Sequence, residues 1–404
     1  SLGLSAMGGI LFLGGGSTVT IAQRMFEGMN SFALLAIPLY TFAGFTMSKG
    51  GISKRLMDFC YSIVGHIYGG LAHVNVLSSM IFAGISGSAV ADTAGVSGMF
   101  MPEMIRKGYS KNFTVAVTAI SSTIGIIIPP SIPMVVIAGI CGISTGKLFL
   151  GGIIPGILCG LTQMIVSYFL AKKEGVPKEP GHFTIGPVLH GLWESWPALL
   201  MPIIIVGTIT MGIVSPTEAG VIAVVYGLFA GGIIYRELKW EDIKFAFAET
   251  VRTSGRIFIV IGAAKLYTVM LTTAGFDKWV AKTMLGFSTN PTVILIMILL
   301  IFFIVTMFME SIATLTLFMP ILYPIALGVG INPIMLSVLI TVVIGIGLVT
   351  PPVGMCIYVA CDLMDTTVGE VFPTLVPFIA ATFVCIALMV AFPQLILLPT
   401  YLMA

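Results

Sequence analysis

Long apolar runs, separated by short polar segments, occupy most of this sequence. Hydrophobic residues make up 57% of its 404 residues and charged residues only 9%, whereas about 25% of the residues of a soluble domain are charged. The mean hydropathy is +1.09. Because a helix needs about 20 apolar residues to cross a bilayer, a chain of this length has room for on the order of ten crossings. The sequence therefore predicts one polytopic membrane domain, and its net charge of +2 gives no indication of nucleic-acid binding.

The apolar runs mark the expected membrane segments. The first run begins directly after Ser1, and we expect it to be a membrane helix that lacks a few preceding residues rather than a signal peptide. A polar break at 172–180 separates two halves, and the segment 236–253 carries charges among aromatic residues, as interfacial helices do. The runs are 2–22, 31–48, 56–72, 74–105, 113–143 and 148–171 before the break, and 193–214, 217–235, 256–274, 278–287, 292–327, 334–364 and 370–400 after it.

No pattern in the sequence indicates an enzyme. It contains no HExxH, GxSxG or Walker motif and no His/Cys cluster. The carboxylates of Asp92 and Glu310 are the one pair that could form an aspartyl-type dyad, but neither lies in a motif that supports this role. The cysteines have no metal-type spacing, and we interpret them as free, buried small hydrophobes. They are Cys60, Cys141, Cys159, Cys356, Cys361 and Cys385.

The two halves of the chain repeat each other at a constant offset. Pro351-Pro352 lies 222 positions after Pro129-Pro130. The same offset relates Pro102 to Pro324, Gly108 to Gly330, Gly125 to Gly347, Ser144-Thr145 to Thr366-Thr367, and Pro155 to Pro377. Chance rarely matches so many Pro and Gly positions, so the sequence predicts an internal duplication.

Basic residues indicate the orientation of each half. Arg106, Lys107 and Lys111 directly follow the run 74–105, so the positive-inside rule places the base of this run in the cytoplasm. Its counterpart, 292–327, has no basic residue at either flank, and its base is expected to face outward. A direct repeat in sequence thus becomes an inverted repeat in the membrane, with two re-entrant hairpins that enter from opposite faces.

Each expected hairpin is followed by a helix that a Pro-Pro pair interrupts. Helix breaks free carbonyl oxygens and expose helix ends with partial charges, and with hydroxyls and one carboxylate they suit a small cation. In the first half, Ser86 and Asp92 with backbone oxygens near Gly125 and Pro130 could form such a site. A Ser-Gly-Ser run alone is more often a close-packing surface, and Pro-Pro alone a kink. The carboxylate favours the cation site, because a mid-membrane charge costs several kcal/mol unless it is paired or solvated.

The repeat predicts a second cation site. Ser311 and Thr314, with backbone near Gly347 and Thr350, occupy the corresponding positions, and Thr314 stands where the first site has its carboxylate. Glu310 is interpreted first as the cap of a half-helix, with a second acidic ligand and a proton carrier as alternatives.

Three motifs resemble a known transporter family. Residues 84–92 read GISGSAVAD, residues 128–134 read IPPSIPM and residues 215–219 read SPTEA. Together, and over essentially the whole chain, they resemble the large membrane subunit (DctM type) of tripartite ATP-independent periplasmic (TRAP) transporters. The resemblance implies an all-α polytopic membrane protein of a bacterial inner membrane, with an inverted repeat and an elevator-type fold similar to the ion transporter superfamily.

The resemblance also implies a function and partners. It implies Na+-coupled uptake of an organic acid of the sialic acid or C4-dicarboxylate class, with a lean toward sialic acid. A small membrane subunit (DctQ type), expected here as a separate chain, and a periplasmic substrate-binding protein are the implied partners. The lack of an ATP-binding motif in the sequence agrees with transport driven by an ion gradient.

By matching position, the resemblance points to hairpin tips and interrupted helices as the sodium sites. The first set is Ser86, Asp92, Gly125, Ile128 and Pro130. The second set, which matches less sharply because residues 308–310 are not small, is Ser311, Thr314, Gly347, Thr350 and Gly354. The substrate is expected between the hairpin tips, near Ser88, Ser131 and Thr316.

These interpretations divide the chain into a moving transport domain and a scaffold surrounded by membrane lipid. The transport domain comprises 74–143 and 292–364. The scaffold comprises 1–73, 144–255, 256–291 and 365–404, and within it the interfacial segments 178–192 and 238–253 are expected to act as bracing arms. A stand-alone sodium- or proton-coupled dicarboxylate carrier of the same architecture, without a binding protein, is the alternative function.

Overall fold

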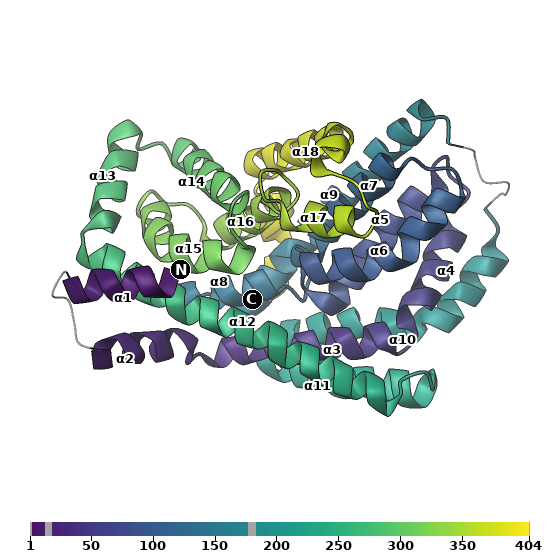
Figure 1. The fold of residues 1–404 in the computed structure, drawn as a ribbon, viewed down its shortest axis with the longest axis horizontal. Helices are drawn as coiled ribbons and strands as arrows, with labels where there is room; N and C mark the ends of the chain where they lie inside the picture. The colour runs from purple at the N-terminus through teal and green to yellow at the C-terminus, as the bar shows by residue number, and fades with distance from the viewer. Residues whose placement is uncertain (1, 13–17, 177–182, 404) are drawn as a thin grey trace.

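The computed structural model describes residues 2–12, 18–176 and 183–403 (Figure 1). In this part of the chain the regular structure is entirely helical, and no strand occurs. The α-helices before the polar break are α1 (Leu2–Phe12), α2 (Thr18–Met29), α3 (Ala36–Lys49), α4 (Ile52–Val64), α5 (Gly70–Ser86), α6 (Ala89–Arg106), α7 (Lys111–Ser122), α8 (Ile132–Cys141) and α9 (Thr145–Lys173).

The α-helices after the break are α10 (Ile185–Thr210), α11 (Pro216–Phe229), α12 (Trp240–Thr273), α13 (Phe276–Phe287), α14 (Pro291–Thr306), α15 (Ser311–Gly328), α16 (Pro333–Gly347), α17 (Met355–Asp362), α18 (Val368–Ala391) and α19 (Gln394–Leu397). Short 3-10 segments, η1 (Phe32–Leu35), η2 (Thr123–Ile126) and η4 (Leu398–Met403), and a π segment, η3 (Ala230–Ile234), extend some of them.

The helix boundaries follow the offset seen in the sequence. Shifting α6 by 222 positions gives the bounds of α15 residue for residue, and α5, α7, α8 and α9 fall in the same way on α14, α16, α17 and α18 to within a few residues. In each half two antiparallel helices form a hairpin, which is followed by a helix that stops at the Pro-Pro pair and resumes beyond it. Both Pro-Pro peptide bonds are cis. The duplication therefore extends from sequence to secondary structure.

The short helix after each break packs against the other half of the chain. The hairpins α5–α6 and α14–α15 lie on different sides of the molecule, with α8, α16 and α17 between them (Figure 1). The helix α8 of the first half packs against α15 of the second, and α17 of the second half packs against α6 and α7 of the first. Each hairpin therefore contacts the interrupted helix of the other half.

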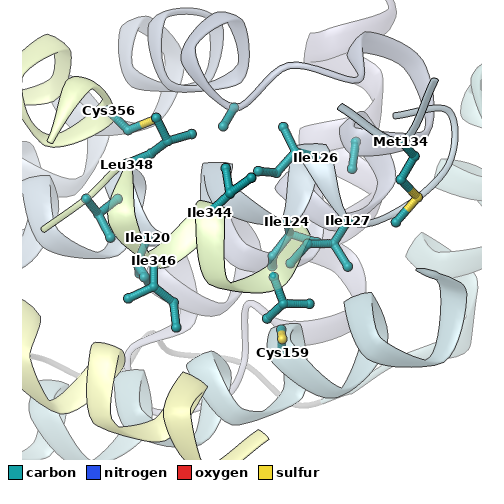
Figure 2. Packing of buried hydrophobic residues seen from close by; sticks show 14 of the residues in the cluster. Ile120, Ile124, Ile126, Ile127, Met134, Cys159, Ile344, Ile346, Leu348 and Cys356 are labelled. Atoms are coloured by element: carbon teal, nitrogen blue, oxygen red, sulfur yellow. The ribbon is translucent and has the colours of Figure 1, made fainter. Parts of the chain in front are cut away.

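The interrupted helices also meet each other through a dense apolar core. Figure 2 shows Ile126 of the first break near Ile344 of the second, with Leu348 beside Cys356, and these side chains are buried. The approach is close at Gly345, where a Cβ atom would lie 3.3 Å from the Cβ of Thr123. The helix ends that face each other are thus buried, whereas Pro352 and Val353 of the second break are exposed.

Outside this core, α12 is the longest helix. It runs along one side of the molecule beside α3 and α11 (Figure 1), and it packs against α1, α2, α3 and α15. The predicted interfacial segment 238–253 and the predicted membrane run 256–274 are therefore one continuous helix, and the boundary expected between 255 and 256 falls inside it. No proline separates the two segments, and Gly255 between them lies inside the helix.

Seven helices in the described part are long and apolar enough to cross a membrane. Their bounds are Phe32–Lys49, Thr145–Lys173, Ile185–Thr210, Pro216–Ile234, Trp240–Thr273, Ser311–Gly328 and Val368–Ala391. Four further apolar helices in the described part are shorter, namely α5, α8, α14 and α16. The count is below the ten or so expected, because the hairpins and helix breaks consume apolar sequence in short helices.

Three other expected segments were wrong in detail. The first run, 2–22, includes two short helices, α1 and α2, and neither is among the seven candidate spans. The run 278–287 is the 12-residue helix α13, which is too short to span. The single C-terminal helix ends at Ala391 and is followed by α19 and η4 beyond Pro393, because proline cannot continue the helical hydrogen bonds. Of the expected arm 178–192, residues 178–182 lie outside the described part, and 185–192 begin α10.

Candidate ion and substrate sites

The tip of the first hairpin is a two-residue turn between α5 and α6. Gly87 has φ +65°, a left-handed conformation that favours glycine, and Ser88 caps α6 by accepting a hydrogen bond from the Ala91 N–H at 3.5 Å. The Ile132 N–H donates to the Gly87 carbonyl at 3.2 Å, and a Cβ at Gly87 would lie 2.7 Å from the Pro130 oxygen. The hairpin tip is thus fixed directly to the first helix break.

Asp92 lies in the first turn of α6 and is completely buried. Its Oδ1 accepts a hydrogen bond from the Ser86 hydroxyl, and its Oδ2 has no hydrogen-bond partner in the protein. The carboxylate lies against Gly125, where a Cβ would come within 3.0 Å of the Asp92 Cγ. A carboxylate oxygen without a partner is therefore directed at the helix break, in a place where only glycine leaves room for it.

Ile128 and Pro130, the other two residues of the first predicted set, lie in the break itself. The Ile128 N–H donates to the Ile124 carbonyl at 3.0 Å, which ends the helical hydrogen bonds. The Pro129 oxygen lies 3.6 Å from the place of a Cβ on Gly84. The structure thus joins Ser86, Asp92 and Gly125 by direct contact and brings Pro130 to the hairpin through Gly87. The described contacts do not link Ile128 to the carboxylate.

The second hairpin has a different polar group at its tip. Glu310 is the N-cap of α15, and its Oε2 accepts hydrogen bonds from the Ile312 N–H at 2.8 Å and the Ala313 N–H at 3.3 Å. Its Oε1 accepts from the Ser311 hydroxyl at 2.5 Å. The interpretation of Glu310 as a helix cap is confirmed. Because both of its carboxylate oxygens accept hydrogen bonds, this carboxylate differs from that of Asp92.

The remaining residues of the second predicted set make local hydrogen bonds. The Thr314 hydroxyl donates to the Glu310 carbonyl at 3.1 Å, and the Thr350 hydroxyl donates to the Ile346 carbonyl at 2.7 Å. Gly347 allows close approach to α14 of the second hairpin, since a Cβ there would lie 2.6 Å from the Thr306 Cβ.

The second break is also tied to its own hairpin. The Val353 N–H donates to the Met307 carbonyl at 3.0 Å, and Gly354, with φ +49°, turns the chain into α17. The second tip therefore repeats the backbone contacts of the first without a carboxylate at position 314.

The three predicted substrate residues do not meet in this structure. Ser88 is half-buried at the first hairpin tip. Ser131 is buried and caps α8, and its hydroxyl donates to the Ile126 carbonyl at 2.5 Å. Thr316 lies inside α15, where its hydroxyl donates to the Ile312 carbonyl at 2.7 Å. No described contact joins these side chains to one another.

A buried polar network, which the sequence reasoning missed, joins the hairpin helix α5 to α7. The Asn75 amide nitrogen donates to the Thr118 hydroxyl at 2.7 Å, the Ser121 hydroxyl donates to the Asn75 amide oxygen at 3.1 Å, and the Ser79 hydroxyl donates to Ser121 at 3.0 Å. All four side chains are fully buried. At the offset of 222 the second half has only apolar residues. They are Met297, Ile301, Ile340 and Val343.

This network had a signal in the sequence. Asn75 and Ser79 are four residues apart in an otherwise apolar run, a spacing that places both side chains on one face of a helix. A second polar contact lies nearer the break, where the Thr93 and Ser122 hydroxyls are 2.6 Å apart. The Cys356 side chain, from the second half, lies close to both hydroxyls.

Within the described residues, no group of three or more His, Cys, Asp or Glu side chains could hold a metal ion. The polar groups near the first break are instead one carboxylate, hydroxyls and backbone carbonyls. Such oxygen ligands suit small hard cations rather than the soft transition metals that prefer Cys and His.

The fold is similar to that of two solved transporters. The YdaH transporter of Alcanivorax borkumensis has a TM-score of 0.62 and 13% sequence identity, with 92% of this chain and 86% of that chain covered. MtrF of Neisseria gonorrhoeae has a TM-score of 0.59 and 13% identity, with 93% and 84% covered. These similarities, together with the candidate spans, define the class as an all-helical polytopic membrane protein with a transporter fold.

The sequence identifies the family within this class. Residues 1–395 match the family described as the tripartite ATP-independent periplasmic transporter, DctM component. The chain belongs to this family, which is one of transporter permeases and not of enzymes, and the resemblance seen in the motifs is confirmed.

Several relatives of this chain are permeases of TRAP transporters for organic acids. The sialic acid TRAP transporter large permease protein SiaM of Vibrio cholerae is 36% identical over 93% of this chain and 88% of that protein. The C4-dicarboxylate TRAP transporter large permease protein DctM of Pseudomonas aeruginosa is 34% identical over 100% and 94%. The isethionate TRAP transporter permease protein DctMQ of Oleidesulfovibrio alaskensis is 36% identical over 94% of this chain, which spans 60% of that protein's length.

Proposed function

We propose that this chain is the transport subunit of a sodium-coupled importer that carries an organic acid across a bacterial inner membrane. The observation that carries the proposal is the buried Asp92 carboxylate, whose Oδ2 is left without a partner beside Gly125 at a helix break. An ionised carboxylate is costly in such a place unless a cation accompanies it. Family membership supports a transport role for that cation.

The substrate class is proposed from the relatives. Relatives that are 33–36% identical to this chain are described as permeases for isethionate, sialic acid, C4-dicarboxylate and 2,3-diketo-L-gulonate. All of these compounds are organic anions, so we propose an organic acid for this chain, with sialic acid as the first to test. The partial positive charge at the N-termini of α6, α8 and α15 is suited to an anionic group between the hairpins.

The proposed partners are a small membrane subunit and a periplasmic substrate-binding protein. The description of the family as tripartite and periplasmic supports both, and the relative described as DctMQ supports the small subunit. The scaffold, with α10, α11 and the long α12, is the proposed docking region. Several apolar side chains of these helices are exposed, among them Trp193, Ile203, Val225 and Ile259.

The proposed mechanism is an elevator movement. Residues 74–143 and 292–364 would move as one body, because α8 packs on α15 and α17 packs on α6 and α7 across the two halves. The inverted orientation of the two hairpins, inferred from the basic residues Arg106, Lys107 and Lys111, would give the site access from both sides of the membrane in turn. Sodium would order the hairpin tips first, and substrate would bind after it.

Uptake by proteoliposomes that contain this chain and both partners tests the proposal. We expect accumulation of the labelled acid only with an inward sodium gradient, and loss of that accumulation in Asp92→Asn. Asp362→Asn, an exposed carboxylate at the end of α17, is the matched control and should transport normally. Equal uptake with a proton gradient and no sodium would refute sodium coupling, and equal uptake without the binding protein would favour a stand-alone carrier.

A further inference from the structure

A lysine lies in the middle of the apolar part of α12, which is a candidate membrane span. Lys265 is nine residues after Arg256 and eight before the end of the helix at Thr273. At 1.5 Å per residue, it lies about 12 to 14 Å from those positions. None of the ion pairs in the described part of the chain includes it, and its side chain is exposed. An ionisable side chain at this depth is costly and indicates a function.

The surroundings of Lys265 place it at the border between the scaffold and the second hairpin. The stem of Lys265 packs beside Gly28 of α2, where a Cβ would lie 2.6 Å from the Lys265 Cβ and 2.8 Å from its Cγ. Thr268 lies one turn further along α12, on the same side of the helix, and its hydroxyl donates to the Thr316 carbonyl of α15 at 3.5 Å. Lys265 therefore lies one turn from the point where α12 contacts α15, with its own stem against α2.

The proposed transport domain has no basic side chain near its helix breaks. The segment 74–143 has basic residues only at the base of its hairpin, and the segment 292–364 has no Lys, Arg or His. Both hairpin tips instead carry acidic groups, Asp92 and Glu310. The proposed transport domain therefore offers an anionic substrate the partial charges of its helix N-termini but no basic side chain near the breaks, and Lys265 of the scaffold could add a full positive charge.

The repeat shows that the lysine is not part of the common architecture. The position 222 residues earlier is Ala43 of α3, a fully buried residue in the corresponding helix. A helix in this place therefore packs without a charge.

We propose that Lys265 binds the anionic group of the substrate at the border between α12 and α15, and so makes the carrier prefer acids over uncharged analogues. The inference rests on the proposed import of an organic acid and adds a residue that determines its specificity. Lysine is a compact cation on a flexible stem, so it can follow a carboxylate or sulfonate as α15 moves past α12.

The test measures substrate affinity in the reconstituted complex, with N-acetylneuraminate, succinate and isethionate as probes. For the acid that the wild type takes up, Lys265→Gln should weaken binding about tenfold to a hundredfold, while Lys265→Arg should stay within about threefold. Lys282→Gln, an exposed lysine on α13, is the control and should change nothing. Lys265→Gln should also lose the preference for the acid over its uncharged amide.

A charge-restoring experiment separates charge from packing. Lys265→Cys is treated with 2-aminoethyl methanethiosulfonate, whose transfer to the thiol forms a mixed disulfide and releases methanesulfinate, or with the uncharged methyl reagent. The charged adduct should regain most of the affinity and the neutral adduct should not. Equal affinity of the two adducts, or an unchanged affinity of Lys265→Gln, would overturn the inference alone. Absence of wild-type uptake for every probe would overturn the proposed function and the inference with it.

Discussion

Replacing Asp92 with asparagine removes a charge and keeps the shape of the side chain. The carboxylate is fully buried, and one of its oxygens accepts from Ser86 while the other has no partner in the protein. Without a cation, such a carboxylate lowers stability, because an unpaired charge is poorly solvated inside a protein. We therefore expect the sodium-free Asp92→Asn protein to be at least as heat-stable as the wild type.

In the presence of sodium the same substitution should weaken ion binding. A sodium ion about 2.4 Å from the carboxylate gains about 7 kcal/mol at an effective dielectric constant of about 20, and the desolvation of both charges offsets most of this gain. A net loss of about 2 to 3 kcal/mol is the expected effect of Asp92→Asn. It corresponds to about 30- to 150-fold weaker binding.

Thermal unfolding of the purified protein at increasing sodium chloride, with potassium chloride to keep the ionic strength constant, measures both effects. At a sodium concentration of about 100 times the Kd, binding stabilises the wild type by about 2.7 kcal/mol, which raises the Tm of a chain of this length by about 3 °C. Asp92→Asn, with its 30- to 150-fold weaker binding, should shift by only about 1 °C or less over the same range, and Asp362→Asn should behave as the wild type. A wild-type shift in Asp92→Asn would show that this carboxylate is not a cation ligand.

Three further predictions concern the hairpin tips and the contact between the halves. Glu310→Ala removes the acceptor of two N–H groups of α15 and should lower the free energy of unfolding by about 1 to 2 kcal/mol, measured by denaturation in detergent, whereas Glu310→Gln should lose less. Gly87→Ala places a Cβ 2.7 Å from the Pro130 oxygen at φ +65° and should weaken sodium binding at least tenfold, while Gly98→Ala, with open space around it, should not; equal affinities would contradict the role of the tip. The Cys385 thiol of α18 lies 3.2 Å from the Thr162 hydroxyl of α9, and Cys159 precedes Thr162 by three residues on the same side of α9. Copper phenanthroline should therefore oxidise Cys159 and Cys385 to a disulfide detectable by mass spectrometry of peptides, and failure to form it would show that the two thiols are too far apart to react.

The repeat made much of this architecture predictable from the sequence. Pro and Gly end helices by their own covalent structure, so the pairs at 129–130 and 351–352 reveal the two breaks without knowledge of the fold. The same reasoning found the cap at Glu310, because a cap depends on residues close in sequence. Those features of the site that are formed by residues close in sequence could therefore be predicted from the sequence.

Contacts between segments that are far apart in the chain could not be predicted from the sequence in this way. Hydropathy indicates how apolar a segment is but not whether two neighbouring segments share one helix, so the two parts of α12 were separated in the prediction. The approach of Gly125 to Asp92, and that of Cys356 to the Thr93 hydroxyl, depends on how the halves pack. Single polar residues such as Asn75 were passed over, because one amide hardly changes the mean hydropathy of a long run.

The network of Asn75, Ser79, Thr118 and Ser121 implies that the two hairpins differ in mechanical behaviour. Moving α5 by one turn along α7 would break three buried hydrogen bonds, each worth about 1 to 3 kcal/mol when its partner is left unsatisfied. The α14–α16 contact has aliphatic groups at these positions and no directional bond to lose, so sliding there changes only dispersion contacts. We expect the second hairpin to move more easily relative to the helix it packs on than the first hairpin does. Amide hydrogen exchange should then be faster in α14 than in α5, and the reverse order would contradict this division of labour.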